Sequence, residues 1–268
     1  MKKISLQIAV VFILLCILIS VQGCKPTPSP SPATTQYTIQ FNLTASGSSI
    51  TTGQAVTAPG GHYYIDLLRF YLGFPRLVKT DGTEVPMSNL CIVALDKYLP
   101  YNSIYGNTFT FSVPAGDYKA VRFGVGLPPA INDTVKHYHN GPFDPLNQVY
   151  GLVWQMSFTF RDIALQMYTD TSKAQNLTPT RPLFVHVLED GDTLNLYHDL
   201  EFDKAFTISS GSTFVDNFNI DANQVFFPSS SPIDIKTAGS TDMTNADKTG
   251  IALGLQLDNN FAKAISKQ

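Results

Sequence analysis

Alternation of apolar and polar residues is the feature that most limits what this chain can fold into. In the segment 37–44, YTIQFNLT, every second residue is aromatic or aliphatic, and the residues between them are Thr, Gln or Asn. Successive side chains of a strand point to opposite faces of a sheet, so this period indicates a strand with one buried and one polar face. An amphipathic helix would need apolar residues three and four positions apart. Packed β-sheets are therefore the expected framework.

Segments of the same kind recur along the chain, separated by turn-forming residues. The turn at 114–117, PAGD, lies between two of them and predicts a hairpin of 109–113 with 118–125. The strands expected from the whole pattern are 37–44, 64–72, 90–95, 109–113, 118–125, 150–160, 183–188, 193–202, 205–208 and 214–220.

The C-terminal end has a different pattern. Its apolar residues predict a short helix over 260–265, capped by Asp258 or Asn259 and packed on a sheet through one face. Many short strands, frequent turns and few helices together predict an all-β fold. The expected architecture is a Greek-key β-sandwich with a short C-terminal helix.

Composition excludes several classes of function. Charged residues make up 15% of the chain and the net charge is −3, so a nucleic-acid binder that works through a basic surface is not expected. A hydrophobic share of 44% can bury a large core, which argues against a disordered chain. The sequence contains neither a G-x-S-x-G elbow nor an H-E-x-x-H pair, and no glycine-rich phosphate loop leads into a helix. We therefore expect a protein that is not an enzyme.

The N-terminus has the layout of an export signal. Lys2 and Lys3 precede an apolar stretch, 4–20, which ends at the small-residue pair Gly23-Cys24. This pair resembles a bacterial lipobox, which predicts a signal peptide over 1–23 and a lipid on the Cys24 thiol; an uncleaved membrane anchor is the alternative.

The residues after the lipobox read KPTPSPSPATT, and alternating proline keeps them extended. We therefore divide the chain into a signal peptide (1–23), a lipidated cysteine with a proline-rich linker (24–35) and one domain (36–268). The expected location is the outer membrane, on its periplasmic or its exposed side.

The positions of the three cysteines limit the metal chemistry available. Cys16 would leave with the signal peptide and Cys24 would become the lipid anchor. Cys91 lies in an apolar segment, where a buried, unreactive thiol is expected. Any site for a soft metal must then use histidine, methionine or the single tryptophan, Trp154.

Histidine is scarce, and two of the five copies are close together in sequence. His137 and His139 flank one tyrosine, so on an extended backbone both imidazoles share a face and can approach one cation. Imidazole suits copper, zinc or nickel, and the thioether of Met243 suits Cu(I). An exposed loop with two histidines and a packing methionine is the alternative.

Two further histidines lie in predicted strands. His186 is inside an apolar strand, where a hydrogen-bonded core histidine and a metal ligand are both compatible with the pattern. His198 precedes Asp199, to which its imidazole could donate a hydrogen bond; a purely structural histidine is the alternative.

The order of motifs resembles the MbnP-like family of exported copper-binding proteins, named for a methanobactin-associated periplasmic protein. The resemblance covers nearly the whole chain after the linker. The segments that carry it are YIDLLRFYL (64–72), PAGDY (114–118), VRFGVGL (121–127), FDPLN (143–147), Trp154-Gln155, FVH (184–186), NFNID (217–221) and the stretch 252–261.

The resemblance implies a β-sandwich with a copper site that uses histidine, and His186 falls at the histidine of a family strand motif. In the founding type a tryptophan is oxidised to kynurenine by a partner diheme enzyme. This implies a diheme cytochrome peroxidase-like partner and makes Trp154 a candidate for oxidative modification. The chain departs from the family pattern at Leu152, where a first tryptophan is usual, at Ser157, where glycine is usual, and at Asp242, where a histidine often precedes the methionine.

These observations lead to one main hypothesis. The protein is a membrane-anchored, non-catalytic lipoprotein that binds copper through some of His137, His139, His186 and Met243. The alternative is a surface lipoprotein that binds a glycan or another ligand, since twelve tyrosines and eighteen phenylalanines are available for stacking. A purely structural or adhesive domain is the third possibility.

Overall fold

The computed structural model describes most of the chain from Thr34 onward, and for a few of these residues only the backbone. The described residues are 34–58, 61–96, 98–128, 131, 144–154, 159–170, 181–188, 196–239, 241–242 and 248–268. The expected signal peptide and nearly all of the linker lie outside them, so the division at 23 and 35 stays a prediction. Within the described part, neither helix is both long and apolar enough to cross a membrane.

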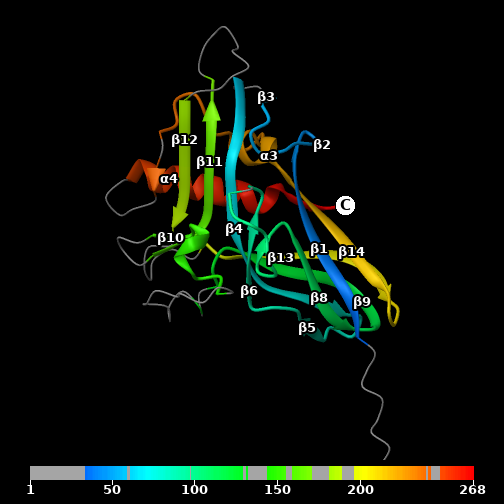
Figure 1. Ribbon diagram of the computed structural model, residues 1–268. Coiled ribbons are helices and arrows are strands. Elements are labelled where there is room, and N and C mark those ends of the chain that lie inside the picture. Colours follow the sequence, from blue (N-terminus) through cyan, green and yellow to red (C-terminus); the bar gives the residue numbers. More distant parts are fainter. Residues whose placement is uncertain are drawn as a thin grey trace, which may run out of the picture. The chain divides into compact units, whose positions relative to one another are not determined.

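The smaller of two sheets is built around β1. β14 pairs with one edge of β1 in parallel, and β8 and β2 pair with it antiparallel. Figure 1 shows β1 and β14 running side by side. The strands of this sheet are β1 (Thr34–Ala45), β2 (Ser48–Ser49), β8 (Thr108–Pro114), β14 (Thr213–Asp221) and β16 (Ile265–Lys267).

The larger sheet has the order β13-β9-β4-β11-β12-β15, with five short strands attached to it. The main strands are β4 (Gly61–Lys79), β9 (Gly116–Val125), β11 (Thr159–Thr169), β12 (Arg181–Leu188), β13 (His198–Ile208) and β15 (Thr241–Asp242). The short strands are β3 (Val56–Ala58), β5 (Glu84–Pro86), β6 (Leu90–Ala94), β7 (Tyr105–Gly106) and β10 (Val153–Trp154).

The core lies between the two sheets. Phe41 of β1 meets Phe70 of β4 and Phe123 of β9 edge to face, with ring centroids 5.6 Å apart in both pairs. Edge-to-face aromatic contacts add to the stabilisation that burial gives. The apolar faces predicted from alternation thus pack against each other, and the predicted all-β sandwich is confirmed.

In the described part of the chain, two helices and one 3₁₀ turn complete the fold. α4 (Lys248–Ala264) packs into the core, where the Phe261 ring lies 5.1 Å from that of Phe70. α3 (Ala222–Phe226) begins at Asp221, whose carboxylate accepts hydrogen bonds from two backbone amides of the first turn. The 3₁₀ turn η1 spans Gln148–Tyr150.

A second group of buried residues lies on the other side of the larger sheet. On β4, Tyr71 belongs to this group, whereas its neighbours Phe70 and Leu72 belong to the core between the sheets. β4 is therefore buried on both faces, which explains why its sequence is denser in apolar residues than simple alternation requires. We call this group the outer cluster; its buried members are Tyr71, Leu90, Ile92, Ala94, Tyr105, Leu127, Leu146, Tyr150, Leu152, Phe160 and Ala164.

The predicted hairpin of 109–113 with 118–125 is wrong. β8 pairs with β1 in the smaller sheet, whereas β9 pairs with β4 and β13 in the larger one. The turn at 114–117 therefore carries the chain from one sheet to the other. Its residues reverse the chain direction, but they do not determine which edge each strand joins.

The C-terminal helix is longer than predicted. It begins at Lys248 rather than near residue 260, and Asp258 lies inside it instead of capping it. Two glycines and the Asp-Asn-Asn run weaken helix propensity locally, yet burial of Leu257 and Phe261 in the core outweighs that cost. The strands expected over 193–202 and 205–208 form one strand, β13, with an irregular register between Asp203 and Phe206.

Candidate metal centre

The structure places two of the predicted site residues and leaves the others outside the described residues. His137, His139 and Met243 belong to this second group, as does Cys24. Trp154 is described through its backbone alone, which pairs with Thr159 in the short β10–β11 ladder. His186 is the one predicted ligand whose side chain is described.

His186 lies on the outer face of the larger sheet. Its chain neighbours Val185 and Val187 belong to the core between the sheets, so the alternating side chain of His186 points away from that core. The residue is nevertheless buried, with 8% of its surface exposed. A buried imidazole in a strand is thus present where the sequence left a core histidine and a ligand both open.

Three neighbouring strands place His186 in a row with a buried arginine. His186 is the register neighbour of Ala164 on β11, and Ala164 is the register neighbour of Arg69 on β4. Register neighbours have Cβ atoms about 4.5–5.5 Å apart, so the small side chain of Ala164 is all that separates the two larger residues along the row. We call Arg69, Ala164 and His186 the outer row.

Arg69 is neutralised within the outer cluster. Its Nε and Nη2 donate to the two carboxylate oxygens of Asp96, at 2.8 and 2.9 Å, and its Nη1 donates to the carbonyl of Tyr150 at 2.7 Å. The guanidinium also lies 5.4 Å from the centre of the Tyr105 ring. The side chains of Arg69 and Asp96 are 6% and 1% exposed, so this is a buried, bidentate ion pair.

The chain connects the residues outside the described part to this same face. Ile131 and Leu146, which lie on either side of 132–143, both pack with the outer cluster. Met243 directly follows Asp242, which is the register neighbour of His186 on β15. The described residues on either side of the segment with His137 and His139 therefore pack with the outer cluster, and the described residue before Met243 in the sequence pairs beside His186.

Within the described residues, no group of three or more His, Cys, Asp and Glu side chains is arranged to hold a metal ion. Cys91 adds no ligand, because burial raises the pKa of its thiol to about 11 and its Sγ lies 3.7 Å from the Ser88 hydroxyl. A protonated thiol is a poor metal ligand at neutral pH. The described part thus offers one imidazole, that of His186, in the place where the sequence predicts a ligand.

The predicted contact between His198 and Asp199 is wrong. His198 Nε2 lies 2.6 Å from Asp258 Oδ2 of α4, whereas Asp199 accepts hydrogen bonds from Arg76. Adjacent residues on a strand point to opposite faces, so the two side chains diverge. The hydrogen bond that the imidazole donates to Asp258 raises the pKa of His198, and the pair joins the first residue of β13 to the helix.

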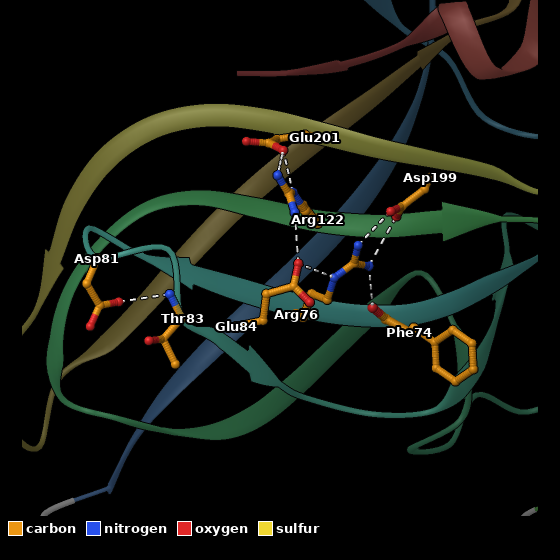
Figure 2. Close-up of polar contacts among 8 residues, drawn as sticks. All are labelled: Phe74, Arg76, Asp81, Thr83, Glu84, Arg122, Asp199 and Glu201. Carbon is orange, nitrogen blue, oxygen red and sulfur yellow. Dashed lines mark hydrogen bonds and ion pairs between the residues drawn. The ribbon is translucent and has the colours of Figure 1, made fainter.

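A second group of charges lies at the other end of the larger sheet (Figure 2). Arg76 contacts Asp199 at 2.6 Å and Glu84 at 3.1 Å. Arg122 contacts the same Glu84 at 2.8 Å and also pairs with Glu201. The carboxylates are 34–45% exposed, so we interpret this group as a solvated link between β4, β5, β9 and β13.

Sequence reasoning missed the part that Arg69 and Asp96 play. One signal was available, since Arg69 is the only basic residue within the apolar segment 64–72. A charge in a strand that is buried on both faces requires a buried partner. The identity of that partner depends on tertiary contacts that no local pattern reveals.

The fold and the buried histidine define an all-β sandwich with a candidate ligand on its outer face. A family model described as MbnP matches residues 34–246, so the chain belongs to the MbnP family. Among solved structures, MbnP from Methylosinus trichosporium is similar, at 17% identity and a TM-score of 0.48. That alignment covers 75% of this chain and 80% of the other. No curated protein matches the chain.

Proposed function

We propose that this protein is an exported, lipid-anchored copper-binding protein with no catalytic activity of its own. His186 is one ligand, and the remaining ligands come from His137, His139 and Met243. The observation that carries the proposal is the position of His186 on the outer row. The strand that ends before Met243 pairs beside it, and Ile131 and Leu146, which flank the segment with the His-x-His pair in the sequence, pack with the outer cluster on the same face.

The chemistry of this donor set fits copper. Imidazole and thioether ligands together select copper over the hard cations, which prefer oxygen. The buried outer cluster around the row lowers the local dielectric and limits the access of water. Arg69 does not repel a bound cation strongly, because Asp96 neutralises it at hydrogen-bonding distance.

The anchor and the partner belong to the same proposal. Cys24 carries the lipid that holds the protein at the outer membrane. Trp154 lies in β10 and pairs with β11, the strand that also contributes Ala164 to the outer row. A diheme peroxidase-like partner oxidises this tryptophan, and a mass spectrum of the native protein checks for the kynurenine form.

The test is a titration of the purified protein with Cu(I) and Cu(II). We expect stoichiometric binding of one oxidation state, loss of binding in a His137→Ala/His139→Ala variant and weaker binding in His186→Ala. His198→Gln is the matched control, because His198 is also a strand histidine but contacts Asp258 rather than the outer row. Equal copper binding by the wild type and by all three variants would contradict the proposal.

A further inference from the structure

A cleft opens at the edge of β1, in a part of the molecule that the metal site does not use. β8 pairs with β1 as far as Gln40, and β2 pairs with it at Thr44 and Ala45. The residues between these two partners line a solvent-open cleft of about 220 Å³. The segment after β2 forms one wall, and the segment that joins β6 to β8 forms the other.

The lining of the cleft is neutral and rich in hydrogen-bonding groups. It contains the carboxamides of Asn42 and Asn107, the hydroxyls of Ser49 and Thr51, and the ring of Tyr101, and none of its residues carries a charge. A carboxamide can take part in about four hydrogen bonds. Within the described part of the chain, Asn42 accepts one, from Gln40 Nε2 at 3.3 Å. The cleft therefore has polar capacity for a ligand but nothing to neutralise an ionic one.

Tyr101 is exposed and yet held in one position. Its hydroxyl donates to the carbonyl of Asp96 at 2.7 Å, and Asp96 is itself fixed by the buried ion pair with Arg69. A Cβ at Gly106 would lie 3.1 Å from Tyr101 Cγ, so the glycine lets the ring pack closely against the backbone there. The side chain of Tyr101 is still 46% exposed. A rigid aromatic surface of this kind contributes to binding at a low cost in entropy.

We propose that this cleft binds one ring of a neutral saccharide. The apolar C–H face of the sugar packs on the ring of Tyr101, and its hydroxyls exchange hydrogen bonds with Asn42, Asn107 and the wall hydroxyls. Clefts that enclose drug-sized ligands have volumes of about 300–1,000 Å³, and this cleft is smaller. A single ring therefore fits, and a longer glycan extends into solvent. The small contact area predicts a dissociation constant on the order of a millimolar.

The experiment uses the full chain, purified in a detergent without a sugar headgroup. Saturation-transfer NMR is recorded with D-glucose, D-galactose, D-mannose and N-acetyl-D-glucosamine, and with D-glucuronate as a charged comparison. We expect transfer to at least one of the neutral sugars and weaker transfer to the charged one. Absence of transfer to all four neutral sugars would overturn the proposal.

Variants locate the site. Asn42→Leu removes hydrogen bonds from the cleft without touching Tyr101, and Tyr101→Ala removes the stacking surface; each should weaken binding about tenfold or more. Tyr98→Ala is the matched control, because Tyr98 is 59% exposed, does not line the cleft and bonds Asp66 instead. Sugar binding that is unchanged in Asn42→Leu and in Tyr101→Ala would also overturn the proposal. Copper binding should remain in Asn42→Leu, which separates this test from that of the metal site.

Discussion

Arg69 and Arg76 lie on the same strand, and each donates hydrogen bonds to an aspartate through two guanidinium nitrogens, yet their surroundings differ. Asp96, the partner of Arg69, has a side chain that is 1% exposed, whereas that of Asp199, the partner of Arg76, is 45% exposed. The first pair is part of the outer cluster, and the second is solvated. The two pairs have the same chemistry and differ in the burial of the aspartate. We therefore assign a structural role beside the candidate site to the pair of Arg69 and Asp96, and a surface role to the pair of Arg76 and Asp199.

A kink in β4 explains why both arginines avoid the core. Leu72 and Leu77 both face the core between the sheets, although strict alternation would put an odd and an even position on opposite faces. The register with β9 shifts between Gly73 and Arg76, and Phe74 within this stretch has a φ of 43°. This irregularity changes the alternation, so that Arg76 points out of the core as Arg69 does.

Asp96→Ala should have the largest effect, because it leaves the buried guanidinium of Arg69 without its counter-charge. Loss of one partner of a buried ion pair costs about 3–5 kcal/mol of unfolding free energy. Asp199→Ala removes the partner of Arg76 in the solvated pair and should cost at most about 1 kcal/mol. Urea unfolding followed by circular dichroism measures both variants. Equal losses of unfolding free energy would contradict the claim that burial of the aspartate sets the strength of the pair.

A double substitution sharpens the same point. In Arg69→Met/Asp96→Leu no charge is left buried, and replacing a buried pair by apolar residues is often neutral or stabilising by about 1–4 kcal/mol. We therefore expect the double variant to recover most of the stability that Asp96→Ala loses. If it is as unstable as Asp96→Ala, then the hydrogen bonds of the pair to Tyr150, Tyr98 and Tyr105, and not the unpaired charge, dominate the energetics.

The pair of His198 and Asp258 is intermediate, with side chains 28% and 2% exposed. Its hydrogen bond raises the pKa of His198 from the ordinary value of 6.5, and burial raises the pKa of Asp258. Both shifts mean that the folded state holds protons more tightly than the unfolded state. The contribution of the His198 shift to stability is therefore complete below pH 6.5 and is lost as the pH rises through the folded-state pKa of His198.

Urea unfolding at a series of pH values measures this dependence. The wild type should therefore lose stability between slightly acidic and alkaline pH, because His198 gives up the proton that its hydrogen bond to Asp258 favours. His198→Gln should lose most of this pH dependence. A variant that keeps the same slope would place the titrating group elsewhere.

Glu84→Gln should have the smallest effect. Glu84 contacts both Arg76 and Arg122 in the solvated group of charges, and such pairs contribute about 0–1 kcal/mol to the free energy of unfolding. The difference from the wild type should disappear at about 1 M salt, where the screening length falls to about 3 Å. A loss of unfolding free energy above about 1 kcal/mol that does not change with salt would mean that solvent screens the Glu84 ion pairs less than the exposure of Glu84 indicates.

Local patterns predicted much of the fold and only part of the site. Alternation located most of the strand segments, because it depends on side-chain direction within one strand, but it missed β11, of which only residues 159–160 fall in a predicted segment. It did not reveal that the turn at 114–117 crosses between sheets, since the choice of edge is a tertiary matter. The partners Asp96 of Arg69 and Asp258 of His198 were missed for the same reason, whereas Cys91 needed only its apolar neighbours to be recognised as buried.

Copper titration of the wild type beside His186→Ala and His198→Gln tests the central claim most directly, because both variants remove a strand histidine but only one is on the outer row. We expect stoichiometric copper binding by the wild type and by His198→Gln, and at least about tenfold weaker binding by His186→Ala. Absence of binding by the wild type, or the same affinity in all three proteins, would contradict it.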